Sequence, residues 1–318
     1  MTVGKLLLII LGIIVAVLLP AVIIAGICYL INPRVGKKSV KIIKLIYRHL
    51  FLVVLCVIWL VPIVWVVLNS FSTDTGINVR QFVPEAFTLD NYKALLFGTD
   101  TVAKFPTWFK NTLVVAIFTC IISSCFVLMV AYAMSCMRFK MRKTLMNLSV
   151  IINLFPGILA MIAVYFVLKH ANLTNSHIGL ILVYSASSGL GYLIAKGFFD
   201  TVPDTLREAA KIDGASELRT FLQIVVPMSK SIIVYTIINA FLMPWADFVY
   251  ARLILHSGLA QDMTVSIGLY NMLNKTLIND YFAQFCAGGV IVSIPISILF
   301  VIMQKFYVEG ITGGAVKG

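Results

Sequence analysis

The chain has 318 residues, of which 60% are hydrophobic and 12% charged, and its formal net charge is +12. Soluble domains carry roughly twice this charged fraction, so the composition excludes an ordinary water-soluble fold and indicates a membrane protein. The basic residues stand in short loops between apolar runs, where Lys and Arg mark the cytoplasmic side. This arrangement leaves no basic face for a nucleic acid.

Seven apolar runs are each long enough to cross a bilayer as a helix, for which about 20 residues are needed. They cover residues 5–31, 49–69, 111–136, 144–168, 177–199, 229–250 and 284–305. The alternating pattern of a membrane barrel is absent, and only helices and closed barrels satisfy the backbone in lipid. The sequence therefore predicts an all-α polytopic helical bundle with about seven transmembrane helices.

The first apolar run, residues 5–31, has a cleaved signal peptide as its alternative interpretation. Its apolar stretch is longer than a signal-peptide core, and no A-x-A cleavage site follows it. We therefore expect a retained transmembrane helix within residues 1–35, followed by the main membrane domain at residues 45–318.

The basic residues after the first run set the orientation, because cytoplasmic loops carry an excess of Lys and Arg. They are Arg34, Lys37, Lys38, Lys41, Lys44 and Arg48. This cluster puts the N-terminus outside, and the turn from Arg138 to Lys143, which has four basic residues and no acid, then falls inside. Alternation places residues 70–110 and 251–283 outside, and residues 200–228 and the tail 305–318 in the cytoplasm.

The predicted spans contain prolines and polar residues that suit a solute path. Proline frees backbone carbonyls, which must face protein or a water-filled path in a membrane. Aromatic faces and polar groups together suit a sugar, and packing between helices is the alternative role for each residue. For Asp247 a further alternative is a position at the outer interface. The candidates for a substrate path are Tyr165, Tyr184, Asn239, Trp245 and Asp247.

The six cysteines and four histidines indicate neither a disulfide framework nor a metal site. The cysteines lie in or at the ends of apolar runs without a CxxC pair, and the histidines are scattered. We expect no metal and no catalytic residue in this chain.

Residues 196–230 form a charged insert between two predicted spans. Five basic and five acidic residues balance within it, so it does not serve to set topology. Pro203 and Asp204 suit the start of a helix, and Gly214 suits its end through a positive φ. A second helix is predicted from Ser216 to Val226, ended by Pro227. Its apolar residues, expected on one stripe, are Leu218, Phe221, Leu222 and Val225.

This insert resembles the EAA motif of binding-protein-dependent ABC importer permeases. The resemblance rests on Glu208-Ala209-Ala210, then Gly214, Ile224 and Pro227. The runs KIDGAS at 211–216, FCAGGVIVSIPISILF at 285–300 and YVEGITGGAVKG at 307–318 are similar to the carbohydrate branch, the MalG type. The resemblance covers roughly residues 45–318.

The resemblance implies a permease subunit that imports a sugar or oligosaccharide across the bacterial plasma membrane. In this family the EAA loop is a coupling helix that docks in a cleft of the ATPase subunit. The coupling residues carried over are Glu208, Ala209, Ala210, Asp213, Gly214, Ala215 and Pro227.

The same resemblance implies the partners. They are a second, MalF-like permease subunit, two ATPase subunits and an extracellular or periplasmic solute-binding protein, which the outer segments 70–110 and 251–283 are large enough to meet. The chain has no G-x-x-x-x-G-K-[ST] loop, so ATP and Mg²⁺ are expected in the ATPase subunits and no cofactor in this chain. The chain itself is expected not to be an enzyme.

Two features depart from the MalG pattern. That type usually has a six-helix core, so the run at 5–31 would be an extra N-terminal helix. Many members also have Asn where this chain has Ala246, between Trp245 and Asp247. An importer of a non-sugar solute remains an alternative, as does an ion-coupled secondary transporter, although no internal repeat supports the latter.

Overall fold

The structure is a computed structural model that describes positions 12 and 23 and residues 33–77, 81–100, 102–186 and 191–315. In these residues all regular elements are helices, apart from one isolated β-bridge between Ser72 and Phe87. The prediction of an all-α protein is therefore confirmed. The predicted helix at 5–31, with its domain 1–35, falls almost wholly outside the described residues.

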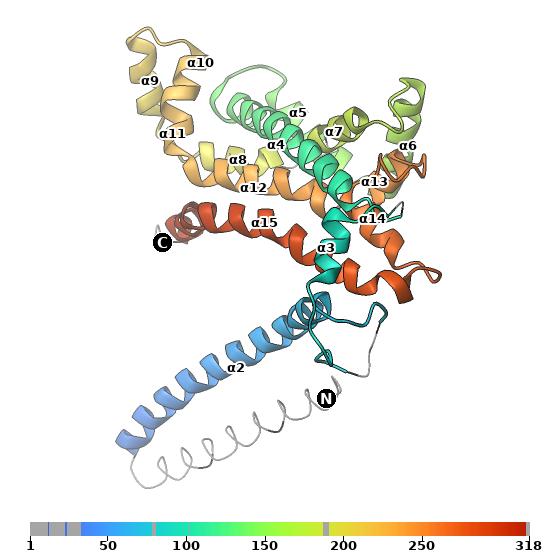
Figure 1. Cartoon of the computed structure of the whole chain (residues 1–318). Coiled ribbons are helices and arrows are strands. Elements are labelled where there is room, and N and C mark those ends of the chain that lie inside the picture. The colour runs from blue at the N-terminus through green and yellow to red at the C-terminus, as the bar shows by residue number, and fades with distance from the viewer. Residues whose placement is uncertain are drawn as a thin grey trace. The chain divides into compact units, whose positions relative to one another are not determined.

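The helices follow one another with short connections, apart from the longer segments 71–89 and 255–264 (Figure 1). The first group comprises α2 (Pro33–Ser70), α3 (Asp90–Phe97), α4 (Phe105–Cys136), α5 (Arg142–Asn153), α6 (Gly157–His170), α7 (His177–Ala186) and α8 (Gly191–Phe199). The second group comprises α9 (Asp204–Ile212), α10 (Glu217–Thr220), the π-helix η1 (Phe221–Val225), α11 (Val226–Met228), α12 (Lys230–Ala246), α13 (Val249–Ile254), α14 (Val265–Met272) and α15 (Ile278–Ala315).

Three described helices are long and apolar enough to cross a membrane without a break. They are Leu45–Ser70 within α2, Phe105–Cys136, and Ile278–Phe306 within α15. Three further pairs meet the same test if each bent pair is one span: α5 with α6, α7 with α8, and the stretch Glu217–Met228 with α12. These six correspond in order to the six apolar runs predicted after residue 45.

Two of the bent pairs break at identifiable backbone positions. The axes of α5 and α6 differ by 101°, and Pro156 precedes α6 with an extended ψ of 117°. Proline disfavours a helical conformation in the residue before it, which explains this break. The axes of the stretch Glu217–Met228 and of α12 differ by 90°, and this break falls at Ser229. By contrast, Pro62, Pro244 and Pro295 lie inside continuous helices.

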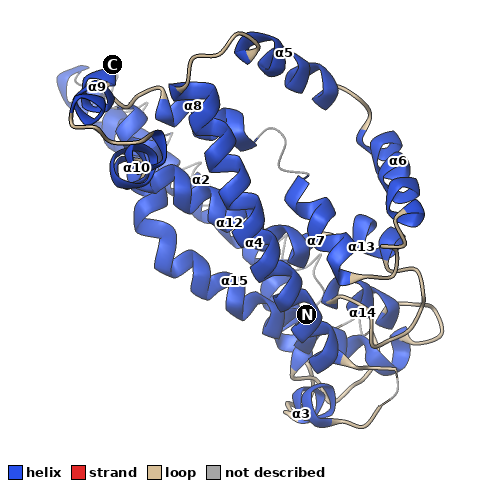
Figure 2. Cartoon of the chain, turned by 90° about the horizontal axis from the view of Figure 1, so that it is seen from above, coloured by secondary structure: helices blue, strands red, loops and turns tan. Residues whose placement is uncertain are grey.

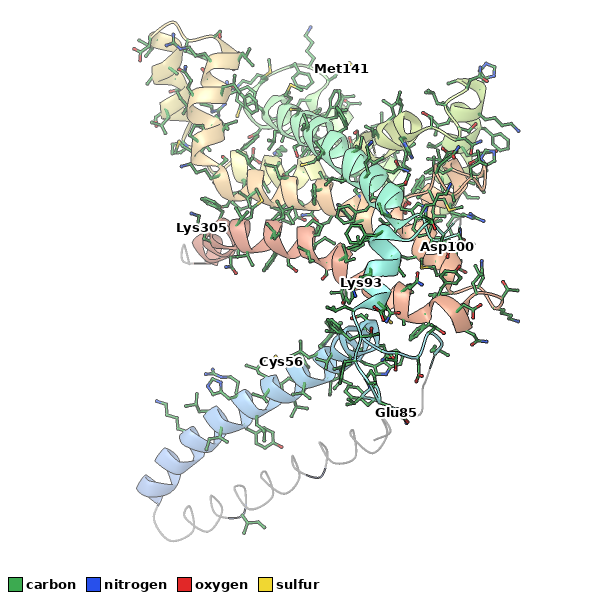
Figure 3. All side chains as sticks on the ribbon, viewed as in Figure 1. Cys56, Glu85, Lys93, Asp100, Met141 and Lys305 are labelled. Carbon is green, nitrogen blue, oxygen red and sulfur yellow. The ribbon has the colours of Figure 1, made fainter. Side chains whose placement is uncertain are left out.

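The chain divides into two compact units, of which the first comprises residues 1–98 and 272–290. Here the end of α2 packs against α3 and the start of α15. The Trp65 and Phe282 rings lie 5.7 Å apart, and the hydroxyls of Ser70 and Tyr92 are 2.7 Å apart. The apolar flank of α2 is exposed around Cys56, as a lipid-facing helix requires (Figure 3).

The second unit, residues 99–271 and 291–318, is built around α4. Helix α12 runs beside α4, and α7 and α8 pack on it as well (Figures 1 and 2). Helices α9 and α10 form a hairpin that projects from this bundle (Figure 1). The unit has an extensive buried core on α4, from Phe105 and Trp108 at one end to Tyr132 at the other.

Candidate functional site

The first helix of the charged insert is α9, which begins after Pro203 and ends at a glycine turn. Gly214 has φ +75°, as predicted, and such a backbone favours glycine because it has no Cβ. The Ala215 N–H donates to the Ala210 carbonyl over 2.9 Å, and the Gly214 N–H donates to the Lys211 carbonyl over 3.1 Å. This pair of bonds is a Schellman motif, which satisfies the last carbonyls of the helix.

The second helix begins at Ser216, whose hydroxyl accepts a 3.3 Å hydrogen bond from the Arg219 N–H. This side-chain cap satisfies one free donor of the first turn, and the acidic Glu217 in that turn complements the helix dipole. Residues 203–228 thus form two capped helices around a glycine turn, and we call residues 203–228 the hairpin.

The end of the second helix differs from the prediction. Pro227 does not end it, because helix α11 continues to Met228 and the chain bends at Ser229. The π-helical turn Phe221–Val225 stands directly before this proline. A proline lacks the N–H that an α-helix requires and clashes with the carbonyl four residues earlier; the wider π turn changes the spacing of carbonyls at this point.

The predicted apolar stripe of the second helix is also wrong, because its residues divide between two sides. Phe221 and Val225 are buried, whereas Leu218 and Leu222 are 63% and 53% exposed. Phe221 and Val225 pack into a cluster with α4, α8 and α12, which includes Tyr132, Phe199 and Ile232. The hairpin is therefore seated on the bundle by one side and presents the other.

Polar contacts join the hairpin and the residues before it to the end of α4. The Tyr132 hydroxyl donates to Glu217 Oε2 over 2.7 Å, and Arg207 donates to the Cys136 carbonyl over 3.1 Å. The Ser135 hydroxyl donates to Asp200 over 2.6 Å. These bonds connect the last turn and a half of α4 to residues 65 to 85 positions later in the chain.

Ion pairs within the insert hold its charges in place around a polar cavity of about 680 Å³. Lys211 pairs with Glu217 across the glycine turn at 2.8 Å, Lys196 pairs with Asp200 at 2.5 Å, and Arg207 pairs with Asp204. The cavity is lined by Ser135, Cys136, Met137, Arg138, Arg142, Asp200, Asp204, Arg207, Glu208, Lys211 and Glu217.

The pKa of Asp200 reflects these contacts. Partial burial acts to raise the pKa, but hydrogen bonds from Lys196 and Ser135 outweigh it, and the pKa lies below its ordinary value of 3.8. The carboxylate is therefore charged at neutral pH and holds Lys196 against the end of α4.

Five of the seven residues assigned to coupling from the resemblance are exposed. Glu208, Ala209, Asp213 and Gly214 are exposed, and Ile212 beside them is 86% exposed. Ala210 is 6% exposed and provides the carbonyl of the Schellman motif. Ala215 is half-buried, and the exposed Pro227 lies in α11.

Two of the five candidates for a substrate path meet directly. Tyr184, which is 1% exposed, donates a 2.7 Å hydrogen bond to Asp247 Oδ2. Asp247 ends α12, and its carboxylate also accepts a 2.9 Å bond from the Ala251 N–H in α13. The Ser266 hydroxyl donates to the Asp247 carbonyl over 2.7 Å. Asp247 therefore joins α7, α12, α13 and α14 where the chain turns between helices.

The other three candidates are not brought to this pair by a direct bond in the described residues. Trp245 is 5% exposed and packs edge-on against Phe109, and its buried Nε1 has no hydrogen-bond partner there. Tyr165 is half-buried beside His256, with ring centroids 5.9 Å apart. Asn239 is exposed and donates to the Tyr235 carbonyl of its own helix over 2.8 Å.

None of Tyr132, Ser135 and Trp108, which contact residues far away in the chain, was predicted as a site residue. A signal existed for the two aromatic residues, because a buried Tyr hydroxyl or Trp N–H usually finds a partner. The sequence of α4 alone does not show which distant residue is the hydrogen-bond partner. In the described residues no group of three or more His, Cys, Asp or Glu side chains is placed to hold a metal ion.

Residues 128–313 match the family described as the inner membrane component of binding-protein-dependent transport systems. The match covers more than half of the chain, including the whole hairpin. The chain belongs to this family. Its members are transport components of the inner membrane, which agrees with the several membrane-length helices of the fold.

Two curated relatives align with most of the chain. The galactooligosaccharides transport system permease protein GanQ of Bacillus subtilis is 33% identical over 282 residues, which is 88% of this chain and 98% of the relative. The maltodextrin transport system permease protein MalD of Streptococcus pneumoniae is 31% identical, over 85% of this chain and 94% of the relative.

A solved structure has the same fold. A chain of a bacterial ABC transporter involved in the import of the acidic polysaccharide alginate superposes with a TM-score of 0.70, covering 83% of this chain and 96% of that one. The sequence identity is 21%, so this likeness bears on the fold alone.

Proposed function

We propose that this chain is a permease subunit of an ABC importer for an oligosaccharide, in which the hairpin docks on a separate ATPase. The observation that carries the proposal is the hairpin itself: two capped helices around Gly214, seated on the bundle by Phe221 and Val225 and exposed on the other side. Family membership supports the transport function, and relatives named for galactooligosaccharides and maltodextrin support an oligosaccharide.

The chemistry of the exposed side suits a protein partner. Small alanines permit close approach, and Ile212, which is 86% exposed, adds an apolar side chain whose burial against a partner would be favourable. Glu208 supplies a charge for a basic residue of the ATPase. Under this proposal the coupling surface is Glu208, Ala209, Ala210, Asp213, Gly214, Ala215 and Pro227, of which Ala210 and Pro227 act by shaping the helices.

The remaining partners follow from the family. A single path needs a second, MalF-like permease, two ATPase subunits supply the energy, and a solute-binding protein delivers the sugar. ATP and Mg²⁺ bind in the ATPase subunits, and this chain holds no cofactor. The ATPase then shifts the permease pair between inward-open and outward-open states.

The membrane arrangement follows from the basic clusters. We place the chain in the bacterial plasma membrane with seven transmembrane helices, the N-terminus outside and the hairpin and C-terminus in the cytoplasm. In this orientation the loop from residue 255 to residue 264 lies outside, at the opposite end of α4 from the hairpin. The solute path is proposed to use Tyr165, Tyr184, Asn239, Trp245 and Asp247.

Copurification from the native membrane tests the docking. Tagged full-length chain should carry the ATPase with it, and Glu208→Lys should weaken that association by reversing an exposed charge. Glu85→Lys is the matched control, because Glu85 is also an exposed acid and belongs to the predicted outer segment 70–110 rather than to the hairpin. Equal ATPase recovery with Glu208→Lys and the wild type would refute the assigned docking surface.

Uptake into proteoliposomes tests the solute. The assembled complex, with its binding protein, is offered a galactooligosaccharide, a maltodextrin and a polyamine, each with and without internal ATP. We expect ATP-dependent uptake of one of the two sugars. Uptake of the polyamine but of neither sugar would indicate an importer of a non-sugar solute. Uptake driven by an ion gradient without ATP would indicate a secondary transporter.

A further inference from the structure

Helix α4 differs from the other membrane-length helices in its lack of interruptions. It runs unbroken for 32 residues, or about 48 Å at 1.5 Å per residue. Its only proline, Pro106, stands in the first turn, and it contains no glycine. The two other continuous spans contain Pro62 and Pro295, and three more are bent pairs. Because sharp kinks arise mainly at proline and at breaks in the helix, we expect α4 to bend less than the other spans in the described residues.

One end of α4 is bonded to the hairpin. Tyr132 reaches Glu217 in the first turn of the second hairpin helix, and the Cys136 carbonyl accepts from Arg207 in the first helix. The Tyr132 ring also packs on Phe221, with centroids 4.9 Å apart. Both helices of the hairpin therefore hold the last two turns of α4.

The other end of α4 is bonded to the loop at residues 255–264. The Trp108 Nε1–H donates to the Ala260 carbonyl over 2.6 Å, and Asn111 donates to the carbonyls of Gln261 and Met263 over 2.8 and 3.0 Å. The loop lies between the end of α13 at Ile254 and the start of α14 at Val265, and it also bonds to the connection before α7 and to its first residue, through the Ser257 N–H to Asn175 Oδ1 at 2.7 Å and between His177 Nε2 and the Asp262 carbonyl at 2.9 Å. Side chains in the first two turns of α4 thus donate hydrogen bonds to the backbone carbonyls of this loop.

The start of α14 is fixed to the same end of α4. The Thr112 hydroxyl accepts a 2.8 Å bond from the Val265 N–H, and both groups are buried. Trp108 is 1% exposed and packs against the backbone of Gly268. The loop and α14 are therefore both hydrogen-bonded to α4.

We propose that α4 is the transmission element of this subunit, which carries movement of the hairpin to the loop 255–264, and that Tyr132 and Glu217 are the positioning residues of this linkage. The inference rests on the proposed function, in which the ATPase moves the hairpin. A stiff helix bonded at both ends moves both attachments together, since packed elements shift as discrete bodies rather than deform. The partner that senses the loop is the solute-binding protein.

The Tyr132–Glu217 bond is the sharpest place to test the linkage. Tyr132→Phe removes one oxygen and keeps the ring against Phe221, and Glu217→Gln keeps the size of the side chain. A hydrogen bond to a charged group contributes roughly a tenfold change or more in an equilibrium. Tyr47→Phe is the matched control, because Tyr47 lies on the exposed flank of α2 and its hydroxyl makes no hydrogen bond in the described residues.

The experiment uses the full complex, purified through the tagged chain, with hydrogen exchange of residues 255–268 followed before and after trapping with ATP and vanadate. In the wild type and Tyr47→Phe we expect nucleotide trapping to change the exchange rate of this segment. In Tyr132→Phe and Glu217→Gln we expect that change to shrink about tenfold, while the ATPase copurifies in the wild-type amount. A bond that only stabilises the fold would not reduce the response to nucleotide while leaving copurification of the ATPase unchanged.

The other outcomes are distinct. A nucleotide-dependent change of wild-type size in both variants would overturn the linkage, as would a wild-type segment that does not respond to nucleotide. Loss of the ATPase from both variants would also overturn it, because the bond would then only hold the hairpin together. Absence of any ATPase from the wild-type preparation would instead refute the proposed function.

Discussion

The Tyr184 hydroxyl donates a 2.7 Å hydrogen bond to the Asp247 carboxylate, which at the same time accepts from the Ala251 N–H at the start of α13. This hydrogen bond lies where α12 ends and the chain turns toward α13. A carboxylate in an apolar protein region is costly without partners, and here the partners are a buried phenol and a helix N–H. Asp247 therefore has a structural role in the described fold, whatever it contributes to a solute path.

The first prediction concerns this pair. Tyr184→Phe leaves one acceptor of Asp247 unfilled and should lower the free energy of unfolding by about 1–3 kcal/mol. In a domain of this size each kcal/mol lowers Tm by roughly 2–4 °C. Thermal unfolding of the purified complex in detergent measures the shift. Tyr47→Phe serves as the control, and an unchanged Tm for Tyr184→Phe would show that the bond contributes nothing.

The second prediction concerns the contact between Trp108 and Gly268. A Cβ at Gly268 would lie 2.2 Å from Cε3 of the Trp108 ring, which is fully enclosed and cannot withdraw. Gly268→Ala should destabilise the protein by about 1–3 kcal/mol through overpacking. Gly197→Ala is its control, because a Cβ at Gly197 in α8 meets no atom within 4 Å. We expect Gly197→Ala to be neutral or stabilising, since alanine favours a helix over glycine.

The third prediction concerns the glycine turn. Gly214 has open space around its Cα but a φ of +75°, so substitution is penalised by backbone strain alone. Gly214→Ala should lower substrate-stimulated ATPase activity, Gly214→Asn should lower it less because Asn tolerates this conformation, and Gly214→Asp should uncouple transport.

Gly258 provides the comparison for this series. It has φ +73° and equally open surroundings, but it lies in the loop between α13 and α14. Gly258→Ala therefore imposes the same strain outside the hairpin, and the amount of ATPase that copurifies should stay at the wild-type level. Substrate-stimulated activity is not compared for this variant, because Gly258 lies in the loop proposed to contact the solute-binding protein. Normal transport by Gly214→Asp in reconstituted vesicles would argue against the hairpin as the coupling element.

The fourth prediction concerns the pH dependence of Asp200. Its folded-state pKa lies below 3.8, so its ionised form stabilises the fold at all pH values above that, and the contribution is lost as the pH falls through the folded-state pKa. Asp200→Asn should lower Tm at pH 7 by a small amount, and the difference from the wild type should shrink below about pH 4. Tm measured at pH 7, 5 and 3.5 tests this; a difference that grows on acidification would contradict it.

Much of the architecture was predictable because it depends on local chemistry. The six apolar runs after residue 45 became six helices or bent helix pairs, since a chain in lipid must satisfy its backbone within each segment. The glycine turn at Gly214 was equally local, because a positive φ is a property of one residue. The break at Pro156 between α5 and α6 was not predicted, because residues 144–168 were expected as one span.

The errors arose where neighbouring residues overrode a local rule. Pro227 was predicted to end its helix, but the helix continues after the π-helical turn to Met228. The bundle packs against Phe221 and Val225 and leaves Leu218 and Leu222 exposed, so only part of the predicted apolar stripe is buried. Helical periodicity assumes an even turn, and only packing decides where that turn widens.

The sequence by itself determined that this is a helical membrane protein with a charged, glycine-centred insert, because composition, span length and the φ of glycine are properties of short segments. Only the tertiary structure decided that Tyr132 meets Glu217, that Trp108 meets Ala260, and that Tyr184 meets Asp247. These pairs are separated by between 63 and 152 residues, and no periodicity along one helix records which distant segment will lie beside it.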